Sequence, residues 1–172
     1  MQEPRKPLRL PGFNYKSAGF YFITFCVQGR LCLLGEITNG KSVLNEAGYI
    51  VYREINTIKN RHFGIHVDIF IVMPNHVHAI IVIEPGRTRR SDPTDFSLAD
   101  VIRNIKTFTT TEYIHGVHTK KWPPFHKRLW QRGYYEQIIR NDKSLSNIRQ
   151  YIIDNPLKWA TDKENPQNTC IL

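Results

Sequence analysis

The sequence predicts a single α+β domain in which an antiparallel sheet carries helices on one face. The chain has 172 residues, of which 41% are apolar, so it is long enough to bury the core of one domain. Runs of β-branched and aromatic residues, which favour strands, alternate with segments whose apolar residues recur at helical spacing. No repeat or shift in composition divides the sequence, and we therefore expect one domain.

Local signals predict the elements in chain order. We expect a strand at 20–27, a hairpin over 33–44, a helix from 46 to about 60, strands at 67–73 and 76–83, a helix from about 97 to 114, a strand at 130–139 and a helix from 142 to 155. The hairpin is expected because Asn39 and Gly40 both tolerate the positive φ angles of a tight turn. Asn45 is a candidate N-cap of the first helix. Pro156 should end the last helix, because the residue before a proline is disfavoured in the helical region.

Without the hairpin and the last helix, the element order is βαββαβ, which is the ferredoxin-like arrangement. In that arrangement the first two long helices pack on one face of the sheet. Residues 1–18 are basic and contain prolines, so we interpret them as an arm on the surface. We place the folded domain at 19–159 and a loose polar tail at 160–172.

The charge of the chain points to a polyanionic partner. Lys and Arg number 24 and Asp and Glu number 15, which leaves a net charge of +9, and the isoelectric point is near 9.6. A basic excess of this size most often serves nucleic-acid binding. The alternative is that the excess only maintains solubility.

The sequence gives no sign of secretion or of a membrane span. Three cysteines form neither a CxxC pair nor a zinc spacing, which favours a reducing compartment. The N-terminal residues lack the apolar stretch of a signal peptide, and no apolar run approaches the ~20 residues that a membrane helix needs. We therefore expect a cytoplasmic protein, associated with the nucleoid, with no membrane partner.

Two histidines open the most apolar run of the chain. His76 and His78 are separated by Val77 and follow the turn Pro74-Asn75. Side chains in a strand alternate between faces, so the two imidazoles point the same way from Cα atoms roughly 6.6 Å apart. Both could reach one metal ion, and an incomplete ligand shell suits a divalent ion that binds substrate phosphates. The alternative is a pair of structural histidines with ordinary hydrogen-bond partners.

A third ligand could come from the last helix. Its apolar stripe includes Ile148 and Ile152, and Asn155 falls on the same stripe with Tyr151 one turn before it. An amide and a phenol would then face the core side of the sheet. The alternative is that Asn155 caps the helix before Pro156 and that Tyr151 is a packing aromatic.

A basic segment near 115–128 combines cations with aromatic residues. It contains Lys120, Lys121, Trp122, Phe125, Lys127 and Arg128. Single-stranded nucleic acid is bound by such mixtures, through phosphate attraction and base stacking. The alternative is a solvated loop with one aromatic residue inserted into the core.

Taken together, these motifs resemble the REP-associated tyrosine transposases, relatives of the single-tyrosine transposases of small insertion sequences. The resemblance covers about Arg9 to Trp159 and rests on five motifs in this order: Gly19–Thr24, Met73–His78, Trp130–Glu136, Ile139–Arg140 and Tyr151–Pro156. A histidine-hydrophobic-histidine triplet is the signature of the HUH enzymes, which cut single-stranded DNA with a tyrosine. By this resemblance the nucleophile is Tyr151, and the metal-side residues are His76, His78 and Asn155.

The resemblance implies a metal-dependent endonuclease and strand-transferase that acts on single-stranded DNA beside hairpin-forming repeats. It implies a 5′-phosphotyrosine intermediate, a divalent Mg²⁺ or Mn²⁺ ion, and action as a monomer or homodimer. The candidate DNA contacts are Arg5, Lys6, Arg9, Lys106, Lys120, Lys121, Trp122, Lys127 and Arg128. The rival hypothesis is a non-catalytic nucleic-acid-binding protein on a ferredoxin-like sheet.

Overall fold

A four-stranded antiparallel sheet forms the centre of the computed structural model, which describes residues 18–85 and 96–168. The strand order is β4-β5-β1-β6, and every neighbouring pair is antiparallel. The strands are β1 (Gly19–Cys26), β4 (Ile65–Val72), β5 (His76–Ile83) and β6 (Tyr135–Ile139). A separate hairpin pairs β2 (Gly35–Thr38) with β3 (Lys41–Leu44), and its turn contains Asn39 at a φ of 51° and Gly40 at a φ of 70°.

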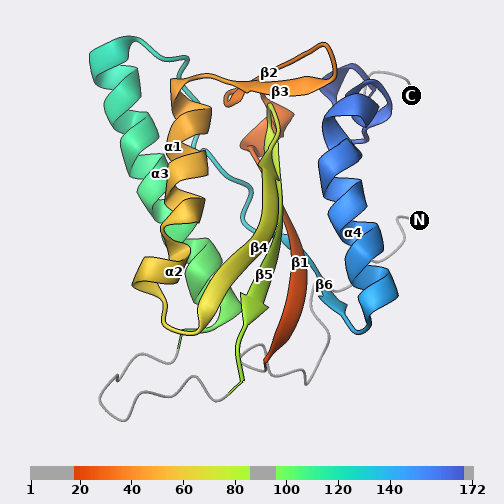
Figure 1. Ribbon diagram of the computed structural model, residues 1–172. Helices are drawn as coiled ribbons and strands as arrows, with labels where there is room; N and C mark the ends of the chain where they lie inside the picture. Colours follow the sequence, from red (N-terminus) through yellow and green to blue (C-terminus); the bar gives the residue numbers. More distant parts are fainter. Residues whose placement is uncertain (1–17, 86–95, 169–172) are drawn as a thin grey trace, which may run out of the picture.

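The helices cover both faces of this sheet (Figure 1). On one face lie α1 (Glu46–Asn56) and α3 (Leu98–Lys120), with the short α2 (Ile58–Arg61) beside β4; α4 (Asp142–Asp154) covers the other. Three short 3₁₀ helices complete the described chain: η1 (Gln28–Arg30), η2 (Asn155–Thr161) and η3 (Pro166–Asn168). The βαββαβ order is confirmed, with both crossover helices on one face and the added C-terminal helix on the other. No helix in the described residues is long and apolar enough to cross a membrane.

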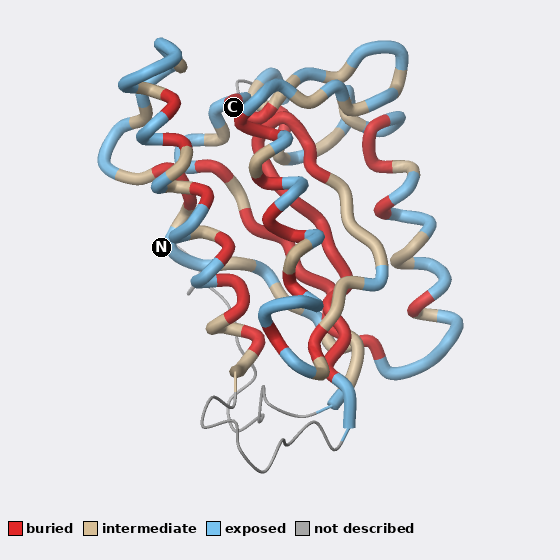
Figure 2. Tube along the Cα trace, turned by 60° about the vertical axis from the view of Figure 1, so that its left-hand side comes forward, coloured by how far each residue is buried: buried red, intermediate tan, exposed pale blue. Residues whose placement is uncertain are grey.

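Alternation along β5 divides the interior into two apolar clusters. Val77, Ala79, Ile81 and Ile83 belong to the large cluster under α1 and α3, whereas Ile80 belongs to a small cluster under α4. Because both faces of the strand are covered, every residue of β5 is buried. Figure 2 shows the buried strands between the two helical layers.

Three expectations about element boundaries were wrong. The second long helix does not end before residue 115 but continues to Lys120, so the first six residues of the expected basic loop are helical. The expected strand at 130–139 is reduced to β6, with one isolated bridge between Val27 and Trp130. Residues 160–168 do not form a loose tail, since Asn165 is buried there and Glu164 pairs with Arg30 at 2.9 Å.

Tertiary contacts explain why α3 is longer than its sequence suggests. Gly116 is a poor helix former, but the indole of Trp122 lies where a Cβ at Gly116 would be. Tyr113 packs against the same indole at 5.3 Å between ring centroids. The helix ends at Lys121, which adopts the left-handed conformation at a φ of 58°.

Candidate active site

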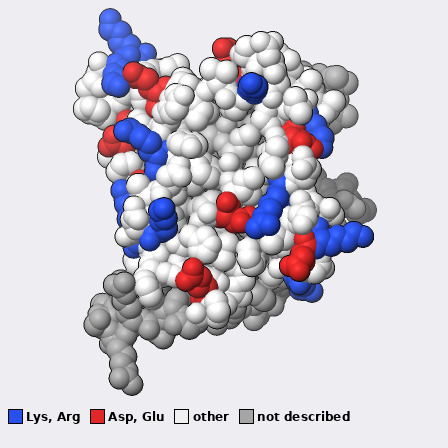
Figure 3. Space-filling model, in the orientation of Figure 1, with Lys and Arg blue, Asp and Glu red and all other residues white. Residues whose placement is uncertain are grey.

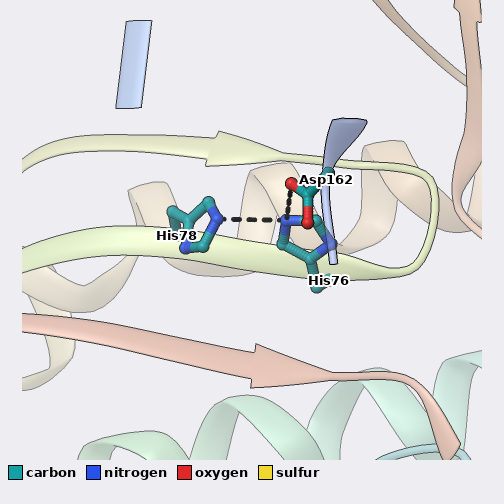
Figure 4. Close-up of side chains that lie close together, drawn as sticks. All are labelled: His76, His78 and Asp162. Carbon is teal, nitrogen blue, oxygen red and sulfur yellow. Dashed lines mark hydrogen bonds and ion pairs between the residues drawn. The ribbon is translucent and has the colours of Figure 1, made fainter. Parts of the chain in front are cut away.

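His76 and His78 lie next to each other on the α4 side of β5 and are almost fully buried. Their exposed fractions are 0% and 3%, and their Nε2 atoms are 3.1 Å apart. Figure 4 shows the two rings pointing toward one another with the carboxylate of Asp162 beside them. Strand alternation therefore does bring the two imidazoles to one point, as the sequence predicts.

Hydrogen bonds at the Nδ1 atoms orient both rings. Nδ1 of His76 is 2.8 Å from Oδ1 of Asn75, and Nδ1 of His78 is 2.7 Å from the hydroxyl of Thr24. An amide oxygen can only accept, so Nδ1 of His76 donates and its Nε2 presents a lone pair to the site. Such a partner is typical of metal-binding histidines.

Asn75 also ties the histidines to two distant segments of the chain. It is fully buried, and its Nδ2 donates to the backbone oxygens of Arg30 at 2.9 Å and Glu164 at 2.8 Å. All three hydrogen bonds use one amide, whose NH₂ group faces carbonyls and whose oxygen faces the imidazole. Asn75 therefore holds His76, η1 and the segment after η2 in a fixed relation.

Asp162 is the site residue that sequence reasoning missed. Its Oδ2 lies 3.9 Å from Nε2 of His76, and one ligand atom each from His76, His78 and Asp162 lie within 4.8 Å of one another. The turn after η2 places it there, with its backbone nitrogen donating to the oxygen of Trp159 at 3.1 Å. Sequence reasoning assigned Asp162 to a loose polar tail, because the polar segment around it has no apolar periodicity.

Tyr151 and Asn155 also lie at the histidines, one turn apart near the end of α4. The Tyr151 hydroxyl is 3.5 Å from Nε2 of His78, and the phenol packs against that imidazole at 5.2 Å between centroids. Tyr151 is 38% exposed, so a substrate can reach its hydroxyl. Asn155 is 2% exposed, and its Oδ1 is buried without a hydrogen-bond partner in the described part of the chain.

The surroundings set the protonation of these groups. Burial lowers the pKa of His76, although the Asp162 carboxylate acts in the opposite direction. Burial, followed by the neighbouring His76, lowers the pKa of His78 well below its ordinary value. Burial and then Asp162 raise the pKa of Tyr151. At neutral pH both imidazoles are therefore neutral, with lone pairs available, and the phenol is protonated.

The donor set fits a divalent metal ion. It contains two neutral imidazole nitrogens, the carboxylate of Asp162 and the unpartnered amide oxygen of Asn155. An uncompensated buried amide oxygen is costly, and an ion at this point would satisfy it. His76, His78 and Asp162 could hold the ion, and Asn155, whose side chain interacts with His76 and Tyr151, could add a fourth oxygen or orient a neighbour.

A cavity of about 1170 Å³ opens from Tyr151 and His78 along β1 and β6. Its walls include the cations Arg30, Lys127, Arg128, Arg132 and Lys163. Figure 3 shows a different kind of surface, the face seen in Figure 1, where basic and acidic side chains are interspersed. Among the described residues, the charged lining of the cavity consists of these five cations and Glu164, and it is therefore mainly basic.

The structure separates the basic residues that the sequence grouped together. Lys127 and Arg128 line the cavity, whereas Lys120, Lys121 and Trp122 are not among its walls. Lys120 pairs with the exposed Glu46 at 2.9 Å, and Trp122 packs against the large apolar cluster.

Lys106 contacts backbone oxygens behind the cavity. Its Nζ donates to the oxygens of Gln131 at 2.9 Å and Gly133 at 2.8 Å, and burial lowers its pKa to about 8. Arg5, Lys6 and Arg9 lie outside the described residues.

Comparison with known proteins places this arrangement in a family. The family model of IS200-like transposases matches residues 37–155. An uncharacterized protein from Haemophilus influenzae strain Rd is 33% identical over 92% of each chain. A second protein from that strain, named as a candidate REP-associated tyrosine transposase, is 26% identical over 84% of this chain and 74% of its own.

Two solved structures share the fold. One is a REP-associated tyrosine transposase bound to a REP hairpin, with a TM-score of 0.55 and 24% identity over 92% of this chain and 74% of that one. The other is a candidate transposase from Deinococcus radiodurans, with a TM-score of 0.51 and 17% identity over 91% of this chain and 98% of that one. The family match covers both histidines, Tyr151 and Asn155, and the chain belongs to the IS200-like transposase family.

Proposed function

We propose that this transposase is a metal-dependent endonuclease and strand-transferase for single-stranded DNA, and that Tyr151 is its nucleophile. One observation carries the proposal. The hydroxyl of Tyr151 lies 3.5 Å from a buried imidazole of the candidate metal cluster, at the end of a cavity lined by cations. A tyrosine that served only in packing would have no reason to place its hydroxyl beside a cluster of candidate metal ligands.

In the proposed reaction the Tyr151 oxygen attacks a DNA phosphorus atom in line. A phosphorus–oxygen bond to Tyr151 forms, the bond to the 3′ oxygen breaks, and the 5′ end remains on the protein as a phosphotyrosine. The phenol loses one proton and the leaving 3′ oxygen gains one, so the step is balanced at neutral pH. The ester preserves the energy of the broken bond, and a second 3′-hydroxyl can reverse the reaction to join another strand.

The chain's own residues prepare this step. Asn75 and Thr24 orient the imidazoles, and Phe22 packs against the Tyr151 ring at 5.9 Å between centroids. When bound, a divalent ion would polarise the scissile phosphate and stabilise the charge that develops there. We propose Mg²⁺ or Mn²⁺, held by His76 and His78 with Asp162 or Asn155, because such ions accept oxygen ligands and leave positions for phosphate.

The proposed substrate is single-stranded DNA beside a hairpin, since a structural relative is described as bound to a REP hairpin. Lys127 and Arg128 are positioned for phosphate contacts from the wall of the cavity. Lys106, Lys120, Lys121 and Trp122 remain proposed contacts, as do Arg5, Lys6 and Arg9. Because Tyr151 meets the histidines of its own chain, one chain supplies the whole candidate site, which supports action as a monomer.

A covalent adduct tests the proposal. Labelled hairpin DNA with single-stranded flanks is incubated with the protein and Mg²⁺ or Mn²⁺ and then separated on a denaturing gel. We expect a protein–DNA adduct that Tyr151→Phe abolishes and that chelation by EDTA prevents. Tyr135→Phe is the matched control, because Tyr135 also lines the cavity and is 48% exposed. An adduct that survives in Tyr151→Phe would overturn the assignment, and DNA binding with no adduct would favour the non-catalytic alternative.

A further inference from the structure

A second hollow lies on the other side of the segment that borders the active-site cavity. Its volume is about 500 Å³, and it lies between α3 and residues 128–134. Four residues line both hollows: Arg128, Gln131, Arg132 and Tyr134. This shared segment, residues 128–134, is called the ridge below.

We propose that the second hollow binds the sugar-phosphate backbone of the nucleic acid whose cleavage site lies beside Tyr151. The proposal rests on the proposed function and adds a second contact region to it. It needs a linear polyanion long enough to cross the ridge, so the ligand class is a polynucleotide and not a mononucleotide.

The lining of the second hollow suits phosphates. It includes Arg103, Arg128 and Arg132 and, on one face of α3, Thr107 and Thr111. No acidic side chain of the described residues lines it. Among the described residues, Arg128 and Arg132 form no ion pair, whereas Arg103 pairs with Asp100 at 2.8 Å. Guanidinium and hydroxyl groups are the usual contacts to DNA phosphate oxygens.

Buried contacts fix the ridge, so both hollows exist before any ligand binds. Lys106 reaches from α3 to the backbone oxygens of Gln131 and Gly133 and lies over the rings of Phe25 and Tyr134 at 5.6 and 5.9 Å. The indole nitrogen of Trp130 donates to the hydroxyl of Thr109 at 2.9 Å. A site formed in advance loses little free energy to ordering when it binds its ligand.

Two threonines on α3 provide a matched test. Thr111 lines the second hollow, whereas Thr119, two turns later, lines neither hollow. Both are exposed, and both donate their hydroxyl to the backbone oxygen four residues earlier. Thr111→Glu and Thr119→Glu therefore change the net charge equally and remove the same kind of helix hydrogen bond, and only Thr111→Glu puts a carboxylate in the hollow.

DNA affinity at several salt concentrations is the readout, with a flanked hairpin as the probe. We expect Thr111→Glu to weaken binding by about tenfold more than Thr119→Glu, because a carboxylate beside phosphates is repelled, and to make binding less dependent on salt. Thr107→Glu, one turn earlier in the same hollow, should behave like Thr111→Glu and guards against a folding defect in one variant. The proposal is wrong if Thr111→Glu and Thr119→Glu weaken DNA binding equally and Thr107→Glu binds DNA as tightly as either of them.

Two shortened probes identify the part of the DNA that occupies the hollow. If a shortened stem removes the difference between the variants, the occupant is the paired stem; if a shortened flank removes it, the occupant is the unpaired strand. Thr119→Glu, which lies outside both hollows, should still form the Tyr151 adduct. A wild-type protein that binds DNA without an adduct would defeat the proposed chemistry, while the contrast between the threonine variants would still decide whether the hollow binds DNA.

Discussion

The two faces of the sheet differ in what they bury. Under α1 and α3 the described residues form an apolar cluster of 23 buried residues. Under α4 the buried apolar cluster has five residues, and the buried polar groups His76, His78 and Asn155 lie beside it. The first face contains most of the buried apolar residues that stabilise the fold. The second face buries fewer apolar residues and carries the polar residues of the candidate site.

One strand serves both faces by alternation. Val77 and Ala79 face the large cluster, and His76 and His78, which alternate with them along the strand, face α4. A shift of one residue in the register of β5 would exchange the two sets. On β1, Thr24 pairs with His78 and Phe25 pairs with Val77. This register therefore determines both where the core forms and where the candidate active site forms. Four predictions test this division, beginning with the largest expected effect.

Loss of a histidine should affect chemistry far more than folding. We expect His78→Ala to reduce adduct formation by more than the ~10–100-fold that loss of a hydrogen-bond partner of a metal ligand usually costs, because a ligand itself is removed. His126→Ala is the control, since His126 is exposed in the same cavity and lies outside the metal cluster. Adduct yield over time and Mn²⁺ titration provide the measurement. Normal cleavage by His78→Ala would return this imidazole to a structural role.

Shortening an isoleucine on each face should give opposite patterns. Ile102 on α3 and Ile152 on α4 are both 1% exposed. Ile102→Ala should lower the free energy of unfolding by about 2–5 kcal/mol with the adduct rate per folded molecule retained. Ile152→Ala should lower the free energy of unfolding by an amount near the lower end of the same range, because the small cluster can relax. It should also slow adduct formation, because it moves Tyr151. Urea unfolding and single-turnover rates compare the two, and equal patterns would argue against the division.

Asn75 should affect the metal site through orientation. Asn75→Ala removes the acceptor for Nδ1 of His76 and the donor to the backbone oxygens of Arg30 and Glu164. We expect Mn²⁺ affinity to fall by roughly 10–100-fold. Asn45→Ala is matched to it, because Asn45 also donates to a backbone oxygen and accepts a hydrogen bond, but at the start of α1. If both variants lose stability and neither loses Mn²⁺ affinity, Asn75 is only a structural residue.

The N-caps of α3 and α4 should give the smallest effects. Ser97 caps α3 with a capping box formed with Asp100, and Asn141 accepts from the backbone nitrogen of Ser144 at 2.8 Å in α4. Each change to alanine should cost about 1 kcal/mol of unfolding free energy. Only Asn141→Ala should also slow adduct formation, because α4 carries Tyr151. Thermal melts and adduct rates measured well below the melting temperature separate the two effects, and slowing by Ser97→Ala would count against this view.

Periodic patterns in the sequence predicted the fold and the centre of the site. Strand alternation predicted that His76 and His78 share a side, and the helical stripe placed Tyr151 and Asn155 toward the sheet. Both arguments need only local geometry and the register of an apolar pattern, and the βαββαβ order followed from the same signals.

The parts that sequence reasoning missed depend on tertiary contacts. Asp162 comes to the histidines through η2 and through the hydrogen bond from Asn75 to Glu164, and neither has a periodic signature. The basic residues near 120 were grouped because they are close in sequence, but the extended α3 places Lys120 beside Glu46 and away from the cavity. A long helix separates residues that a loop would have brought together.

The position of Tyr151 in the chain determines when during synthesis the proposed activity could arise. The proposed nucleophile, Tyr151, follows His78 by 73 residues, and Asp162 follows it in turn. Ribosomes make the chain from the N-terminus, and early segments can fold before later ones emerge. A nascent chain that has reached β5 already carries both histidines but does not yet contain Tyr151. The proposed DNA-cutting activity would therefore arise late in synthesis, and an unfinished chain could not nick the DNA that encodes it.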